Sequence, residues 1–113
     1  MTKRKCLTEC VKMWTWLAKN SSADKSDYFD AHTELEVPFY GCYACGWVIQ
    51  HYEDIGLGSC QRCPIKWPDS TCQNMASPFI VWLGSRDPAV RTTAAKDIVK
   101  LSRQALRRLG RVE

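Results

Sequence analysis

The segment CYACGWVIQHYEDIGLGSCQRC, residues 42–63, sets the expected architecture of this chain. It begins and ends with a Cys-x-x-Cys unit, and fourteen residues separate the two units. Two intervening residues let both thiolates of a unit reach one ion, and two units supply the four ligands of a closed tetrahedral zinc shell. The segment therefore predicts one structural zinc ion, held by Cys42, Cys45, Cys60 and Cys63.

The spacer between the two units is slightly shorter than is usual for this motif, which leaves other ligand sets open. Cys72 or His51 could replace one of the four cysteines. The same thiolates could hold an iron centre, or the four cysteines could pack in the core without a metal. Four thiolates leave no open position for a water molecule, so we expect a structural role for the metal. Its binding would contribute on the order of 10 kcal/mol to the folding of a small domain.

Around the two units the composition is typical of short strands. Residues 35–40 and 47–52 are rich in aromatic and β-branched side chains, and Gly56 and Gly58 supply a turn before the second unit. These features predict a zinc-ribbon-like β-hairpin between two metal knuckles, within a zinc module of residues 35–72. Between this module and the N-terminal segment, residues 23–33 favour turns or a short irregular helix.

Two amphipathic helices are expected on either side of the module. In residues 4–19, Cys6, Cys10, Met13 and Leu17 recur at helical spacing. In residues 87–109, Asp87 can cap the helix and Pro88 suits its first position. The apolar stripe of this second helix comprises Val90, Ala94, Ile98, Leu101, Ala105 and Leu109. The sequence thus predicts a small α+β fold, a single zinc-stabilised domain spanning residues 1–113.

Cys6 and Cys10 stand at positions i and i+4, a spacing that could also serve a second metal. They lie on the apolar face of their helix, however, and reduced cysteine is often a small buried apolar residue. We therefore expect both to pack in the core.

The cysteine content indicates the cellular compartment. The chain of 113 residues has seven cysteines, an odd number that complete disulfide pairing cannot accommodate. No stretch resembles a signal peptide or a membrane span, because charged side chains interrupt the N-terminal segment. We expect a cytoplasmic protein without membrane contact, in which the thiols are reduced and bind metal.

Charge is distributed unevenly along the chain. Residues 20–59 carry one basic and seven acidic side chains, whereas residues 86–113 carry eight basic and three acidic ones. On the C-terminal helix, basic residues recur opposite the apolar stripe, and this face could be solvated, bind nucleic-acid phosphates, or dock on an acidic protein or anionic ligand. The candidate partner-binding residues are Arg91, Lys96, Lys100, Arg103 and Arg107.

Catalytic signatures are missing from the sequence. The chain has two histidines and shows neither the spacing of a nucleophile–histidine pair nor a glycine-rich phosphate loop. We do not expect an enzyme.

Several short motifs occur in a fixed order: WTWLAKN at 14–20, KSDY at 25–28, the two Cys-x-x-Cys units, CPI at 63–65 with Trp67, and SPF at 77–79 with Trp82. In this order the chain resembles short cysteine-rich zinc-binding proteins of tailed bacteriophages, most of which have no assigned function. The strongly basic final helix departs from that pattern.

The resemblance implies a protein made in the infected bacterial cell that binds, and inhibits or redirects, a host or defence protein. The alternative is a zinc-ribbon-like nucleic-acid-binding regulator that uses its basic C-terminal helix.

Overall fold

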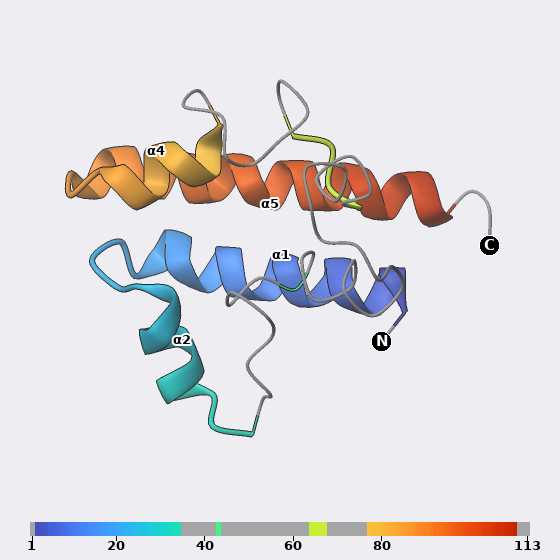
Figure 1. The fold of residues 1–113 in the computed structure, drawn as a ribbon, viewed down its shortest axis with the longest axis horizontal. Coiled ribbons are helices and arrows are strands. Elements are labelled where there is room, and N and C mark those ends of the chain that lie inside the picture. The colour runs from blue at the N-terminus through green and yellow to red at the C-terminus, as the bar shows by residue number, and fades with distance from the viewer. Residues whose placement is uncertain (1, 35–42, 44–63, 68–76, 111–113) are drawn as a thin grey trace, which may run out of the picture.

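The computed structural model describes residues 2–34, 43, 64–67 and 77–110. This part of the chain contains four helices (Figure 1). They are α1 (Lys3–Lys19), α2 (Lys25–Ala31), α4 (Pro78–Gly84) and α5 (Pro88–Gly110). None of the described helices is long and apolar enough to cross a membrane.

Local capping determines where the two long helices begin. At α1, the Thr2 hydroxyl accepts a hydrogen bond from the Lys5 amide at 3.0 Å. At α5, the Asp87 carboxylate accepts one from the Ala89 amide at 2.9 Å, and Pro88 occupies the first helical position. These bonds satisfy amides that have no partner within the helix.

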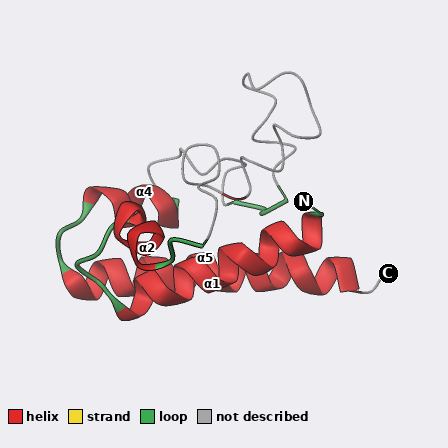
Figure 2. Ribbon diagram, turned by 90° about the horizontal axis from the view of Figure 1, so that it is seen from below, coloured by secondary structure: helices red, strands yellow, loops and turns green. Residues whose placement is uncertain are grey.

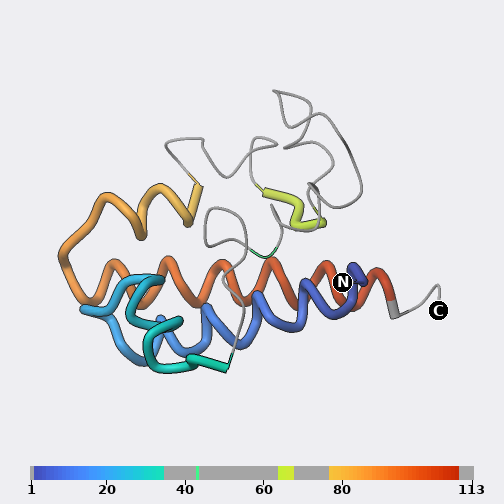
Figure 3. Tube along the Cα trace, turned by 60° about the horizontal axis from the view of Figure 1, so that its bottom comes forward, coloured from blue at the N-terminus to red at the C-terminus, as the bar shows by residue number. Residues whose placement is uncertain are grey.

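Helices α1 and α5 run antiparallel, side by side, with the start of α1 and the end of α5 at the same end of the pair (Figures 1 and 3). Helices α2 and α4 both lie on one side of this pair (Figure 2). The opposite side of the pair is covered by no other described element.

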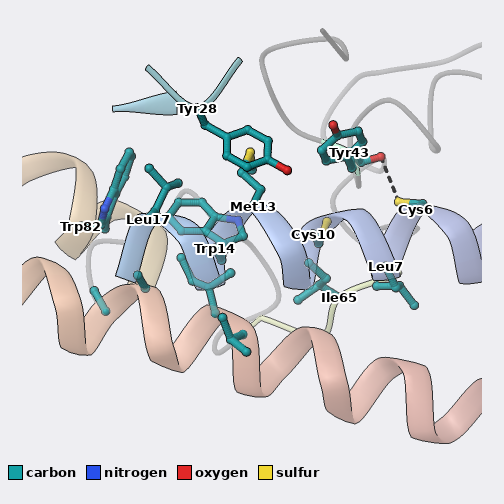
Figure 4. Packing of buried hydrophobic residues seen from close by; sticks show 14 of the residues in the cluster. Cys6, Leu7, Cys10, Met13, Trp14, Leu17, Tyr28, Tyr43, Ile65 and Trp82 are labelled. Carbon is teal, nitrogen blue, oxygen red and sulfur yellow. Dashed lines mark hydrogen bonds between the residues drawn. The ribbon is translucent and has the colours of Figure 1, made fainter. Parts of the chain in front are cut away.

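The core follows the seam of the long pair and includes side chains of α2 and α4 as well as Tyr43 and Ile65 (Figure 4). Trp14 of α1 packs edge-on against Trp82 of α4, with the ring centroids 4.8 Å apart. Leu17 of α1 and Ile98 of α5 are completely buried in the same cluster. Apolar burial of this kind is the main favourable term in folding, so the seam between the helices stabilises the described part of the molecule.

The predicted α+β fold class is wrong. The described residues form an all-α structure with no strand among them. The segments assigned to the β-hairpin, and most of the predicted zinc module at 35–72, fall outside the described residues.

Helix α4 shows why composition misled the prediction. Its sequence, PFIVWLG, contains four aromatic or β-branched residues, the same number as the segment at 47–52. It is nevertheless helical, because Pro78 occupies its first turn, the Ser77 hydroxyl accepts from the Phe79 amide at 3.3 Å, and Trp82 is buried. A short apolar run therefore does not distinguish a strand from a buried helix.

The expected helices at 4–19 and 87–109 correspond to α1 and α5. The interval expected to form turns or a short helix contains α2. Ala94, Ile98 and Ala105 of the predicted α5 stripe are buried, whereas Val90 is exposed. Position 90 lies beside α4 and lines an open apolar groove between α4 and α5.

Candidate anion-binding groove

A groove runs between α1 and α5, with a volume of about 750 Å³. Five cationic side chains line it together with small and hydroxyl-bearing residues. The described lining residues are Thr15, Ala18, Lys19, Thr92, Lys96, Val99, Lys100, Arg103 and Arg107. No carboxylate is among them. We refer to this feature as the basic groove.

Helical periodicity places the basic groove on the open side of the α1–α5 pair. Thr15 and Lys19 are one turn apart on α1 and lie away from Trp14, which faces α4. Thr92 joins the two walls, because its hydroxyl donates to the Ala18 carbonyl at 3.3 Å. Val99 is buried and contributes an apolar surface to the lining of the groove.

The cations of the groove are not neutralised by the described carboxylates. On the rest of α1, Lys5 and Lys12 both pair with Glu9, at 3.0 and 3.4 Å. The basic side chains of the groove form no ion pair with any described residue, and all five are exposed. The groove therefore presents a concentrated positive charge to solvent.

Four of the five predicted partner-binding residues lie together in the basic groove: Lys96, Lys100, Arg103 and Arg107. Arg91 does not. It is only 7% exposed, and it borders a separate hollow beside α2 and α4. Helical spacing alone did not reveal that Trp82 of α4 packs over this side chain and separates it from the other four, and its role in partner binding stays a prediction.

Arg91 instead joins three parts of the described structure. Its guanidinium lies over the Trp82 ring, 4.3 Å from the centroid. Its nitrogens donate to the turn between α1 and α2 and to the end of α4. The acceptors are the carbonyls of Ser21 at 2.7 Å, Ala23 at 2.7 Å, Trp82 at 3.2 Å and Ser85 at 3.3 Å, and a carboxylate oxygen of Asp24 at 3.2 Å. This geometry is that of a structural cation.

The wall that α1 contributes was missed by sequence reasoning. Lys19 and Thr15 belong to the groove, yet the sequence indicated only the basic face of the C-terminal helix. The missed signal is a second polar stripe on α1, because Thr8, Thr15 and Lys19 recur at helical spacing away from the apolar face. Its significance depends on the antiparallel pairing of α1 with α5, which no local pattern shows.

The four predicted zinc ligands, Cys42, Cys45, Cys60 and Cys63, lie outside the described residues, as do His51 and Cys72. Within the described ranges, no group of three His, Cys, Asp or Glu side chains is placed to hold a metal.

Three described residues in or next to the cysteine units are buried. Tyr43 lies inside the first unit, and Ile65 and Trp67 follow the second. All three belong to the same buried cluster as Cys6 on α1, and Figure 4 shows Tyr43, Ile65 and Cys6.

Cys6 and Cys10 are buried at 0% and 1% exposure, which confirms the prediction that they pack in the core. The Cys6 thiol donates to the Tyr43 carbonyl at 3.0 Å (Figure 4).

Comparison of the chain with protein-family models, with curated proteins and with solved structures gives no match.

Proposed function

We propose that this chain is a zinc-stabilised binding protein, without catalytic activity, whose working surface is the basic groove. It engages a polyanionic macromolecule of the bacterial cytoplasm and thereby inhibits or redirects it. The single observation that carries this proposal is the set of five exposed cations, paired with no described carboxylate, that α1 and α5 bring to one groove.

The repulsion between neighbouring cations on α5 destabilises the helix, and this unfavourable free energy supports a functional interpretation of the groove. Lys96 and Lys100 are four residues apart on α5, and so are Arg103 and Arg107. Like charges at this spacing destabilise a helix by about 0.2–0.5 kcal/mol per pair. The pairing of Glu9 with Lys5 and Lys12 is an arrangement that removes such a cost elsewhere in the chain. A bound polyanion would remove it in the groove.

The zinc part of the proposal is supported by the burial of described residues beside both cysteine units. Tyr43 and Ile65 are 3% and 2% exposed and belong to one core. Cys42, Cys45, Cys60 and Cys63 would hold the ion, and the ion would supply folding free energy. The resemblance to phage proteins, and with it a role in the infected cell, remains a prediction.

The test is capture from bacterial lysate with the purified full chain and with a Lys100→Glu/Arg103→Glu variant. We expect the wild-type chain to retain a partner that the variant loses, while both proteins keep the same melting temperature, because exposed charges contribute little to stability. Equal capture by the two proteins would exclude the basic groove as the working surface.

A protein partner with an acidic surface is the second candidate function. The exposed apolar side chains of Val81 and Leu83 on α4, 38% and 59% exposed, favour it, because protein partners bury apolar side chains at the centre of an interface. A Leu83→Glu substitution should then weaken capture, although it leaves the basic groove intact.

A further inference from the structure

We infer that the basic groove takes the phosphate backbone of a nucleic-acid duplex without reading its base sequence. This inference rests on the proposed function and names the class of polyanion. It follows from the spacing of the cations, the chemistry of the other lining residues and the contribution of two helices.

The α5 cations form a row of suitable length. From Lys96 to Arg107 the helix rises by about 16 Å, at about 1.5 Å per residue. Each phosphate of a strand carries one negative charge, so a row of four cations on α5, with Lys19 opposite, can face successive phosphates of one strand segment.

The other lining residues suit phosphates and not bases. No aromatic side chain on which a base could stack is among the described residues of the groove, and no Asn or Gln that could read a base edge. Thr15 offers a hydroxyl, a group that commonly donates to phosphate oxygens, whereas the Thr92 hydroxyl already donates to the Ala18 carbonyl. The groove therefore favours a paired backbone whose bases face inward.

The second wall distinguishes this arrangement from a charged helix face. Lys19 lies on α1, and Thr92 of α5 is bonded to the α1 backbone, so both helices flank the same space. A backbone seated in the groove would contact cations from both sides. Removing Lys19 should then weaken binding, even though all α5 cations remain.

The experiment measures fluorescence anisotropy of a labelled mixed-sequence DNA duplex of about two helical turns, titrated with the full chain. With four or five phosphates neutralised, log K should fall with log salt at a slope of about −4. Between about 50 and 200 mM salt the affinity should fall by about 10²-fold. A second duplex of different sequence should bind with the same affinity.

Matched variants separate the groove from overall charge. Lys100→Glu/Arg103→Glu should weaken duplex binding at least about tenfold. It should also reduce the magnitude of the salt slope by about two. Lys66→Glu/Arg86→Glu makes the same charge change at exposed positions outside the basic groove and should leave most of the affinity. Lys19→Glu should reduce the magnitude of the salt slope by about one, whereas Lys66→Glu should leave the slope unchanged.

A parallel titration with labelled polyglutamate distinguishes the outcomes. Groove-dependent binding of the duplex supports the inference. Groove-dependent binding of polyglutamate without binding of the duplex would overturn it and leave the proposed function standing, with an acidic protein as the partner class. Binding of neither probe would contradict both, and equal loss in the groove and control variants would show that net charge alone attracts the duplex.

Discussion

At the scale of single residues, Glu9 is a buried carboxylate whose ionisation is coupled to folding. Burial alone would raise its pKa, but Lys5 and Lys12 outweigh this effect and hold the pKa of Glu9 below the ordinary glutamate value. A carboxyl with a lowered folded-state pKa contributes stability above its unfolded-state pKa and loses that contribution as pH falls through the folded-state value.

We therefore predict that Glu9→Gln lowers the free energy of unfolding at neutral pH, by on the order of 1 kcal/mol, and removes this acid-dependent loss. Urea denaturation from neutral to acidic pH measures both effects. In a Lys5→Met/Lys12→Met variant the free energy of unfolding should depend on pH in the opposite direction. Burial then raises the pKa of Glu9, and its protonation stabilises the fold. An unchanged pH profile in Glu9→Gln would contradict the assignment.

Tyr43 carries a buried hydroxyl with no hydrogen-bond partner among the described residues. Burial is the main cause that raises the pKa of this phenol, so it stays protonated at neutral pH. An unpartnered buried hydroxyl costs about 1–3 kcal/mol. Tyr43→Phe should thus raise the free energy of unfolding, by up to about 1 kcal/mol, in chemical denaturation. The backbone acceptor of the Cys6 thiol remains in this variant, so a loss of stability would reveal a partner for the hydroxyl.

At the scale of secondary-structure elements, Arg91 fixes α5 to α4 and to the turn after α1. Lysine keeps the charge at this position but loses the planar fork of five donors. We predict that Arg91→Lys lowers the free energy of unfolding by about 3 kcal/mol, since it leaves the buried Trp82 carbonyl and the partly buried Ser21 and Ala23 carbonyls without donors. The exposed Arg103→Lys serves as the control and should cost less than about 0.5 kcal/mol.

Polyanion binding provides a second measurement for Arg91. Because Arg91 lies outside the basic groove, folded Arg91→Lys protein should bind the duplex with wild-type affinity. An Arg91→Lys variant that is stable but does not bind the duplex would indicate that Arg91 belongs to the partner-binding surface.

An element could be predicted from the sequence where the interactions that form it lie within a few residues of one another. Helix α5 was predictable because Asp87, Pro88 and the buried stripe around Ile98 act within a few residues. The basic row from Lys96 to Arg107 was predictable for the same reason. The helicity of α4 was not, because its apolar composition suits a strand equally well and only its cap and packing decide the outcome.

The role of Arg91 could not be predicted either, since its main acceptors, the Ser21 and Ala23 carbonyls, lie about seventy residues earlier in the chain. The same holds for Lys19, which reaches the groove only because α1 and α5 run antiparallel. Contacts of this range depend on the tertiary fold and leave no local pattern in the sequence.

At the scale of the whole molecule, the predicted zinc site and the helical core should unfold together. Tyr43, Ile65 and Trp67 flank the two cysteine units and are buried against the core that α1 contributes to. If one ion holds both units, its loss releases these three side chains from the core at the same time. Loss of the ion then lowers the free energy of unfolding by more than the disordering of a surface loop would, because the apolar area of these side chains returns to water.

We predict one zinc ion per chain by elemental analysis, and its loss together with a broad, low-temperature melting transition in Cys45→Ser and Cys60→Ser. Cys6→Ala and Cys10→Ala are the matched controls, because both cysteines are buried yet are not predicted ligands. Each should keep the full zinc content and cost about 1–2 kcal/mol of packing. Zinc retained at full stoichiometry in both serine variants would exclude the four-cysteine site. Zinc lost from either alanine variant would instead place a thiol of α1 among the ligands, so that the core and the metal site would share a residue.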